Sequence, residues 1–376
     1  MPTAMFVTRL ARTLTLKIPQ MCNDRSRLAH HHETHTRSQA FAAVPHQYRA
    51  KQCRDSSDLD NALDLPTLLL VPHRCHSARV SRYEVGFNYR FAGGNVAHHA
   101  YGVGSGGIAG VGSRQTILAY YSMRGVEFDQ RVAAASAAGF DGIGFGVSEY
   151  LQLRANGTSD DDFKQVLSQH NIRILELEAL RLLDDKSALD FEHVARTFGA
   201  ERIQVIAPFG TNKDIDLDVA AQWLGALAER TADADVHYAL EFLPPTNIPD
   251  IATAQNFVRR SGHPNVGLCV DTWHVFRGAG VSSLADLDYS LVKNVQVDDG
   301  TMTPSMDDYI QDCIHNRELL GAGEFDLEQF FERTPPNAPI SVEIIDDDLD
   351  LIPAFERAQL QASSLQRMMA RRYRQD

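Results

Sequence analysis

The sequence predicts an α/β protein built around a (β/α)8 TIM barrel that is preceded by an N-terminal extension of low structure. From Gln115 onward, short apolar runs alternate with helix-like stretches eight times over about 250 residues, which is the number and length typical of this barrel. An open, doubly wound sheet would also alternate, but it normally carries a glycine-rich turn after its first strand. Here Ser122-Met123-Arg124 follows the first run, which favours the barrel.

The expected strands are short apolar runs, as in a parallel sheet that is buried on both faces. They cover residues 116–121, 141–147, 172–177, 202–207, 237–242, 266–271, 292–297 and 340–345. Gly139 is expected to end the first helix, and Ser159 to cap the next one. The expected helices cover residues 127–138, 159–170, 188–198, 217–232, 250–260 and 351–367.

The chain changes composition near Arg114. Residues 1–114 contain 14 Lys and Arg against 7 Asp and Glu, a net charge of +7, whereas the remainder contains 22 against 42, a net charge of −20. We predict that residues 1–114 form an N-terminal extension that is largely disordered, and that the barrel covers residues 115–370. The first 21 residues contain no acidic residue, so a signal for an organelle stays open as an alternative to the cytoplasm, which is the expected location.

Composition also limits the partners. A strongly acidic barrel argues against nucleic acid or an anionic membrane surface, because both need basic residues on the protein. No run of 18 apolar residues is present, so no membrane span is expected. The five cysteines have no regular spacing, which suits a reducing compartment. A homo-oligomer is left open.

Four polar side chains lie late in the last four expected strands. They are Glu241, Asp271, Gln296 and Glu343. A lone carboxylate in a buried strand is costly unless it is paired or binds a cation, and barrel strands converge at their carboxyl ends. These oxygen donors predict one shared divalent ion, with Mn2+, Mg2+ or Co2+ favoured and Zn2+ compatible. Each residue alone could instead be a strand-end carboxylate bonded to a backbone amide or an arginine.

Three further residues are candidates for contact with the substrate. His274 follows Asp271 by three residues and is expected at the start of a loop over the site, although a core histidine is the alternative. Trp273 could stack on a sugar face or cap the barrel. Glu178 closes the third strand and could line the pocket or pair with Arg181.

The chain from Gln115 to Ala370 resembles the xylose isomerase-like TIM barrel superfamily, in particular its sugar phosphate isomerase/epimerase group. The resemblance is carried by ALEF around Glu241, VDTWHVFRGAG from Val270, VQVDDG from Val295, RELLGAGEFD from Arg317 and SVEI around Glu343. It implies that Glu241, Asp271, Gln296 and Glu343 hold a divalent metal, and that Glu241 and Glu343 transfer the proton. It also implies that His274 touches the substrate, with Arg317 as the candidate for a further substrate contact after the seventh strand.

Gln296 departs from most epimerases of this group, which carry histidine at that position. An amide oxygen can still bind a hard cation, and the glutamine is similar to what dehydroshikimate dehydratases of the superfamily use. We therefore expect a metal-dependent isomerase or epimerase acting by proton transfer on a small keto sugar or polyol. The alternatives are a metal-dependent dehydratase resembling 3-dehydroshikimate or keto-inositol dehydratase, and a non-catalytic polyol-binding barrel. Endonuclease IV, another relative, needs more histidines and a basic face.

Overall fold

The computed structural model describes residues 107–108, 110–210 and 214–372. The predicted N-terminal extension up to residue 106 lies outside the described residues, so its predicted disorder and its boundary with the barrel at residue 114 stay predictions. Within the described ranges, no helix is both long enough and apolar enough to cross a membrane.

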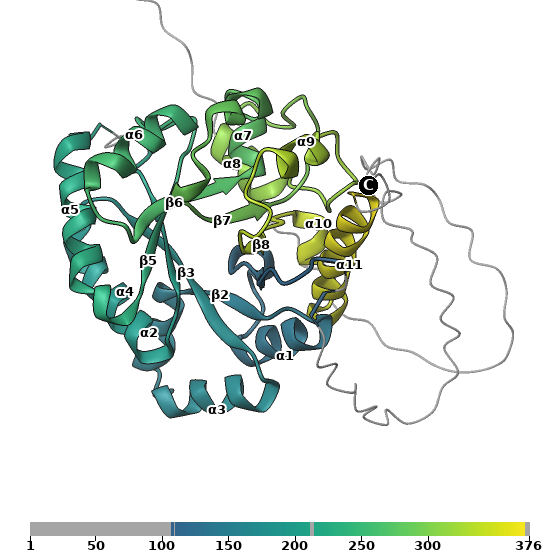
Figure 1. The fold of residues 1–376 in the computed structure, drawn as a ribbon. Helices are drawn as coiled ribbons and strands as arrows, with labels where there is room; N and C mark the ends of the chain where they lie inside the picture. Colours follow the sequence, from purple (N-terminus) through teal and green to yellow (C-terminus); the bar gives the residue numbers. More distant parts are fainter. Residues whose placement is uncertain (1–106, 109, 211–213, 373–376) are drawn as a thin grey trace, which may run out of the picture. The chain divides into compact units, whose positions relative to one another are not determined.

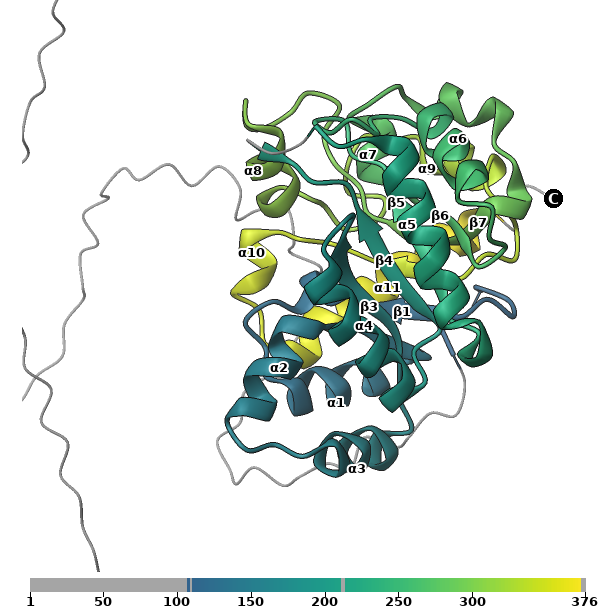
Figure 2. The ribbon, with the colours of Figure 1, turned by 90° about the vertical axis from the view of Figure 1, so that its left-hand side faces the viewer.

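The barrel consists of eight parallel strands that close in sequence order, with β8 paired to β1 (Figures 1 and 2). This confirms the predicted fold class. The strands are β1 Thr116–Leu118, β2 Gly142–Gly146, β3 Arg173–Arg181, β4 Arg202–Ile206, β5 His237–Glu241, β6 Val266–Asp271, β7 Val292–Val297 and β8 Ile340–Val342. Each predicted strand is present. The third is longer than expected, and the first and eighth are shorter.

The helices expected from the sequence lie outside the barrel. They are α1 Phe128–Ala138, α3 Asp160–His170, α4 Asp185–Phe198, α5 Leu217–Arg230, α6 Ile251–Ser261 and α11 Ala354–Arg372. Gly139 ends α1 with a left-handed φ of 89°, and Ser159 with Asp162 forms a capping box at the start of α3. The last helix packs against α1, which closes the helical ring around the strands (Figure 1).

Several shorter helices were not expected. They are α2 Val147–Ala155, α7 Thr272–Phe276, α8 Tyr309–His315, α9 Leu327–Glu332 and α10 Asp347–Asp350. All but the first begin at an aspartate whose side chain accepts a backbone N–H of the first turn. Such short helices carry too few residues to show an apolar period, so the capping aspartate is the signal that could have found them.

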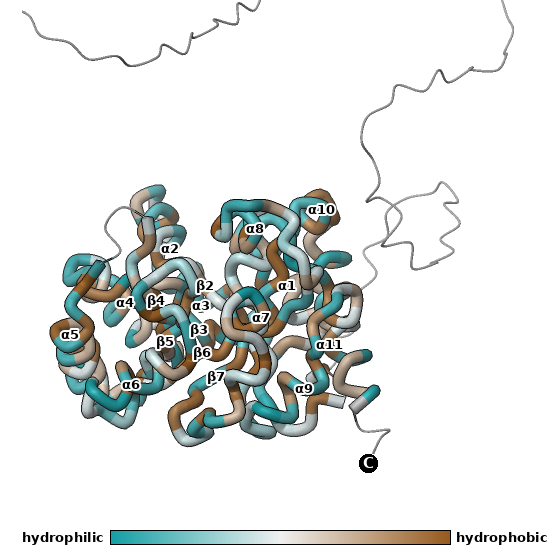
Figure 3. Tube along the Cα trace, turned by 90° about the horizontal axis from the view of Figure 1, so that it is seen from above, coloured by the Kyte–Doolittle hydropathy of each residue, from teal (hydrophilic) through white to brown (hydrophobic). Residues whose placement is uncertain are grey.

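The apolar core fills the space between the strands and the outer helices. Figure 3, seen from above, shows hydrophobic and hydrophilic residues alternating along helices such as α5 and α6, as expected for helices with one buried side. The inside of the barrel is more polar. At its base, Asn294 Nδ2 and Ser341 Oγ donate hydrogen bonds to the two carboxyl oxygens of Glu176, at 3.0 and 2.8 Å. This bonded polar layer supports the side chains nearer the carboxyl ends of the strands.

Candidate active site

Glu241, Asp271 and His274 lie together at the carboxyl ends of the strands. Glu241 and Asp271 are the last residues of β5 and β6, and His274 lies in α7, which starts directly after Asp271. The Oδ1 atom of Asp271 accepts the backbone N–H of Trp273 at 2.6 Å, so the strand turns at once into the helix. His274 is therefore on a helical turn, which corrects the expected loop, and it is buried rather than held above the site.

The distances within this group suit a metal site. His274 Nε2 lies 2.6 Å from Glu241 Oε1 and 3.9 Å from Asp271 Oδ2. One ligand atom from each of the three residues lies within 4.8 Å of the others. Carboxylate oxygens with an imidazole nitrogen are a common ligand set for Zn2+ and Mn2+. The three residues could therefore hold a divalent metal ion.

Tyr309 orients the imidazole of His274. Its hydroxyl is hydrogen-bonded to Nδ1 of His274, and the two rings stack with their centroids 6.0 Å apart. Burial raises the pKa of the Tyr309 hydroxyl above its ordinary value, so the group stays a neutral hydroxyl whose oxygen can accept the Nδ1–H of His274. That tautomer leaves Nε2 without a proton, as a metal ligand requires. The sequence reasoning missed Tyr309, because it lies on the short helix α8, 35 residues after His274.

Arg317 connects three carboxyl groups that lie at or directly after the ends of β6, β7 and β8. Its Nη1 atom lies 3.0 Å from Asp271 Oδ2, 2.5 Å from Asp298 Oδ2 and 3.0 Å from Glu343 Oε2. The guanidinium is buried. Isolated antiparallel bridges on both sides of Arg317, from Asn316 to Asp346 and from Glu318 to Asp299, hold this segment between the loops that follow β7 and β8.

The buried carboxyl groups differ in protonation. Burial opposes ionisation of Asp271, but Arg317 and then His274 hold its pKa below the ordinary value. Burial, followed by the charge of Asp271, raises the pKa of Asp298 well above its usual range. Burial also raises the pKa of Glu343, against Arg317 and together with nearby carboxylates. A site so rich in buried acids is suited to a cation.

Gln296 lies beside Asp271, its Cα partner in the pairing of β6 with β7. Its amide oxygen accepts a hydrogen bond from the Cys269 thiol at 2.9 Å. Burial raises the pKa of that thiol, so it stays protonated and can donate. The structure thus groups His274 with Glu241 and Asp271, while Gln296 bonds to Cys269 and Glu343 pairs with Arg317. The roles of Glu241, Asp271, Gln296 and Glu343 as metal ligands stay predictions.

Trp273 and Glu178 occupy different parts of the barrel mouth. Trp273 is fully buried, with the Arg277 guanidinium 4.3 Å from its ring centroid and Phe325 at 5.9 Å, which fits the alternative in which the indole caps the barrel. Glu178 lies inside β3, and its Oε1 accepts the backbone N–H of Tyr120 at 2.9 Å. Arg181, the alternative partner of Glu178, instead lies over the Phe209 ring.

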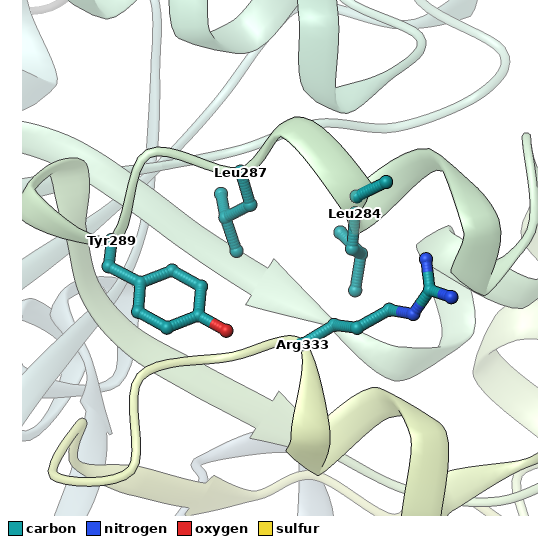
Figure 4. A pocket seen from close by; sticks show the side chains of 5 residues that line it. Leu284, Leu287, Tyr289 and Arg333 are labelled. Carbon is teal, nitrogen blue, oxygen red and sulfur yellow. The ribbon is translucent and has the colours of Figure 1, made fainter.

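A separate pocket lies at the other end of the barrel. It has a volume of about 510 Å3 and is lined by Leu284, Ala285, Leu287, Tyr289 and Arg333 (Figure 4). These residues belong to or directly follow η4 Val281–Asp286, η5 Tyr289–Leu291 and α9, which precede β7 and β8 and so lie near the amino ends of those strands. The pocket is therefore distinct from the group of Glu241, Asp271 and His274.

The chain belongs to the xylose isomerase-like TIM barrel family, whose model matches residues 132–370. Among curated protein sequences, none matches this chain. Solved structures share its fold. A xylose isomerase-like TIM barrel/4-hydroxyphenylpyruvate dioxygenase fusion protein is 22% identical with a TM-score of 0.59, over 67% of this chain. The match spans 42% of the length of that fusion protein.

Other structures with this fold are similar over nearly their whole length. The IolI protein, solved with a bound zinc atom, is 19% identical with a TM-score of 0.59, and the match covers 68% of this chain and 98% of IolI. The probable 3-DHS dehydratase AsbF from Bacillus anthracis is 14% identical, with a TM-score of 0.51 over 67% and 98% of the two chains. D-allulose 3-epimerase from Methylomonas sp. is 17% identical, with a TM-score of 0.53 over 69% and 98%.

Proposed function

We propose that the chain is a divalent-metal-dependent isomerase or epimerase that transfers a proton on a small keto sugar or polyol. The observation that carries the proposal is the buried group of Glu241, Asp271 and His274, whose ligand atoms lie within 4.8 Å of one another at the carboxyl end of the barrel. Family membership supports an enzyme with this site position, since characterised barrels of this fold carry their chemistry at that face.

The donor set fits a divalent metal. Glu241, Asp271 and His274 would hold the ion, with Gln296 and Glu343 as the further predicted ligands. When bound, the ion supplies Lewis acidity to a substrate carbonyl or hydroxyl. Mn2+, Mg2+ and Co2+ suit the carboxylates, and the imidazole makes Zn2+ equally acceptable.

The proton transfer is assigned to Glu241 and Glu343. They lie three strands apart around the barrel, on β5 and directly after β8, so a substrate between them would have one carboxyl group on each side. One would remove a proton and the other would return it. Arg317 contacts Glu343 and Asp271, so it would also hold these carboxylates in place while it faces a substrate oxygen.

A dehydratase is the second candidate, and Gln296 favours it, because the resemblance to dehydroshikimate dehydratases includes a glutamine at this position. AsbF supports this alternative only through its shared fold. In this reaction the proton would be lost beside a leaving hydroxyl. A non-catalytic barrel that binds a polyol is the third candidate.

The test begins with metal content. Purified wild-type protein is expected to contain about one Mn, Mg, Co or Zn per chain by elemental analysis, and the double variant E241Q/E343Q is expected to lose it. Product analysis with keto sugars and cyclic polyols then separates the two reactions, because isomerisation conserves mass and dehydration loses water. Wild-type protein that binds no metal after reconstitution would contradict both enzyme proposals.

A further inference from the structure

We propose that Glu178 is a substrate-binding residue, and that its Oε2 atom hydrogen-bonds an uncharged hydroxyl or carbonyl group of the substrate. The inference rests on the proposed function. It concerns the part of the substrate that lies opposite the metal ligands and does not contact the metal.

Glu178 points into the barrel. Its neighbour two residues earlier, Glu176, is bonded inside the barrel to Asn294 of β7 and Ser341 of β8. Because side chains alternate along a strand, Glu178 lies on the same inner face, one step closer to the carboxyl end of β3. It therefore lies above the bonded polar layer, at the level where the site residues gather.

One of the two carboxyl oxygens of Glu178 makes no hydrogen bond within the described part of the fold. Oε1 accepts the backbone N–H of Tyr120 at 2.9 Å. Oε2 is buried and has no hydrogen-bond partner among the described residues. Glu178 as a whole is only 5% exposed. A buried carboxyl oxygen without a partner is unfavourable, and a ligand atom at this position would complete its hydrogen bond.

The space around this carboxyl group is made by glycines on β2. A Cβ atom on Gly144 would lie 2.1 Å from Glu178 Oε1 and 2.7 Å from the Tyr120 nitrogen. A Cβ atom on Gly146 would lie 2.6 Å from the Tyr120 ring. The missing side chains of the two glycines thus leave room for the Glu178 carboxyl group beside Gly144 and for the Tyr120 ring beside Gly146.

The surroundings select an uncharged partner. Burial and then the charge of Glu176 raise the pKa of Glu178 to about 8, so the group carries a proton at neutral pH and can donate as well as accept. Glu241 also acts on Glu178 as a nearby negative charge. A sugar hydroxyl or keto oxygen can pair with this neutral carboxyl group, whereas a phosphate or carboxylate group would bring an uncompensated charge into a buried position.

Tyr121 adds a second uncharged donor at the rim. The residue as a whole is 42% exposed, whereas burial of its hydroxyl end, followed by the charges of Glu178 and Glu343, raises its pKa to about 12. The hydroxyl is therefore protonated throughout the physiological range. We infer that the β1–β3 side of the mouth holds the neutral, hydroxylated end of the substrate.

The test compares E178A and E178Q with E176Q, a control on the same strand and face whose carboxyl oxygens are both bonded within the barrel. Binding of D-fructose, myo-inositol and D-fructose 6-phosphate to metal-loaded protein is measured by calorimetry, with metal content and melting temperature recorded for each variant. For the neutral ligand that binds wild type, E178A should weaken binding about tenfold or more at unchanged metal content. E178Q should stay within about threefold, because the amide replaces the protonated carboxyl as a donor.

The outcomes separate the two proposals. If wild type binds a neutral ligand and folded E178A binds it equally well, Glu178 has only a structural role and this inference falls while the proposed function stands. A preference of wild type for the phosphorylated sugar that depends on Glu178 also overturns it. If metal-loaded wild type binds none of the three, both the proposed function and this inference fail.

Discussion

His274 Nε2 lies 2.6 Å from Oε1 of Glu241, although the two residues come from α7 and β5. The contact exists because Asp271 ends β6 and caps α7, which turns His274 back toward the neighbouring strand. The two carboxyl oxygens of Asp271 therefore have different partners. Oδ1 caps α7, and Oδ2 faces His274 and Arg317.

Removing the imidazole should weaken metal binding. We expect H274A to lower metal affinity about ten- to hundredfold, because it removes either a ligand or the group that orients Glu241. Competition with a chelator of known affinity measures the change. His263 is a matched control, since its Nε2 contacts the exposed Glu229 on the outside of the barrel. Equal metal affinity in H274A and H263A would show that His274 takes no part in metal binding.

Arg317 should stabilise the barrel through its buried ion pairs. Replacing it by methionine leaves Asp271, Asp298 and Glu343 without their guanidinium, and breaking such buried pairs costs about 3–5 kcal/mol. Urea unfolding of protein treated with a chelator measures the loss. The control R196Q breaks a surface pair with Asp233 and should cost less than about 1 kcal/mol. Comparable losses in the two variants would show that the buried network contributes no more than a surface pair.

Glu178 should make stability depend on pH. Its pKa is raised from 4.5 to about 8 in the folded protein, so the folded state binds more protons than the unfolded state between these values. The contribution of Glu178 to the free energy of unfolding is then fully present below pH 4.5 and is lost as pH rises toward 8. E178Q cannot ionise and should gain up to a few kcal/mol relative to wild type by pH 9. Urea unfolding across this pH range, with a chelator present, measures the difference, and a difference that does not change with pH would contradict it.

Gly144 should tolerate no side chain. The Cβ of alanine would lie 2.1 Å from Glu178 Oε1, so G144A must displace Glu178 or β1. We expect a loss of about 1–3 kcal/mol from overpacking. Gly107, where the nearest atom to an added Cβ is 3.6 Å away, provides the control G107A, which should be near neutral. Thermal unfolding compares the two. A melting temperature of G144A equal to that of wild type would show that the carboxyl group of Glu178 is not confined.

The alternation of apolar runs and helices was enough to predict the barrel, because a parallel strand buried on both faces leaves a continuous apolar signature. The positions of Glu241 and Asp271 at the ends of their strands were predictable for the same reason. The strand bounds were less secure at β8, which ends at Val342 and leaves Glu343 directly after the strand.

Tyr309 and the cluster around Arg317 could not be predicted in the same way. Tyr309 lies on a helix of seven residues, and Asp298 lies in a loop, so neither position has a periodic pattern. The thiol bond from Cys269 to Gln296 joins side chains of neighbouring strands, and only the strand register brings them together.

The sequence by itself determined the fold class and the strand ends at which the acidic residues lie. The reason is that the local pattern of apolar residues indicates which segments are buried strands and how long they are. Only the tertiary structure decided which of those residues meet. It paired His274 with Glu241, placed Arg317 among three carboxylates, and left Glu178 Oε2 without a partner. These relationships depend on distances of a few ångströms between separate strands and short capped helices, and sequence spacing does not encode such distances.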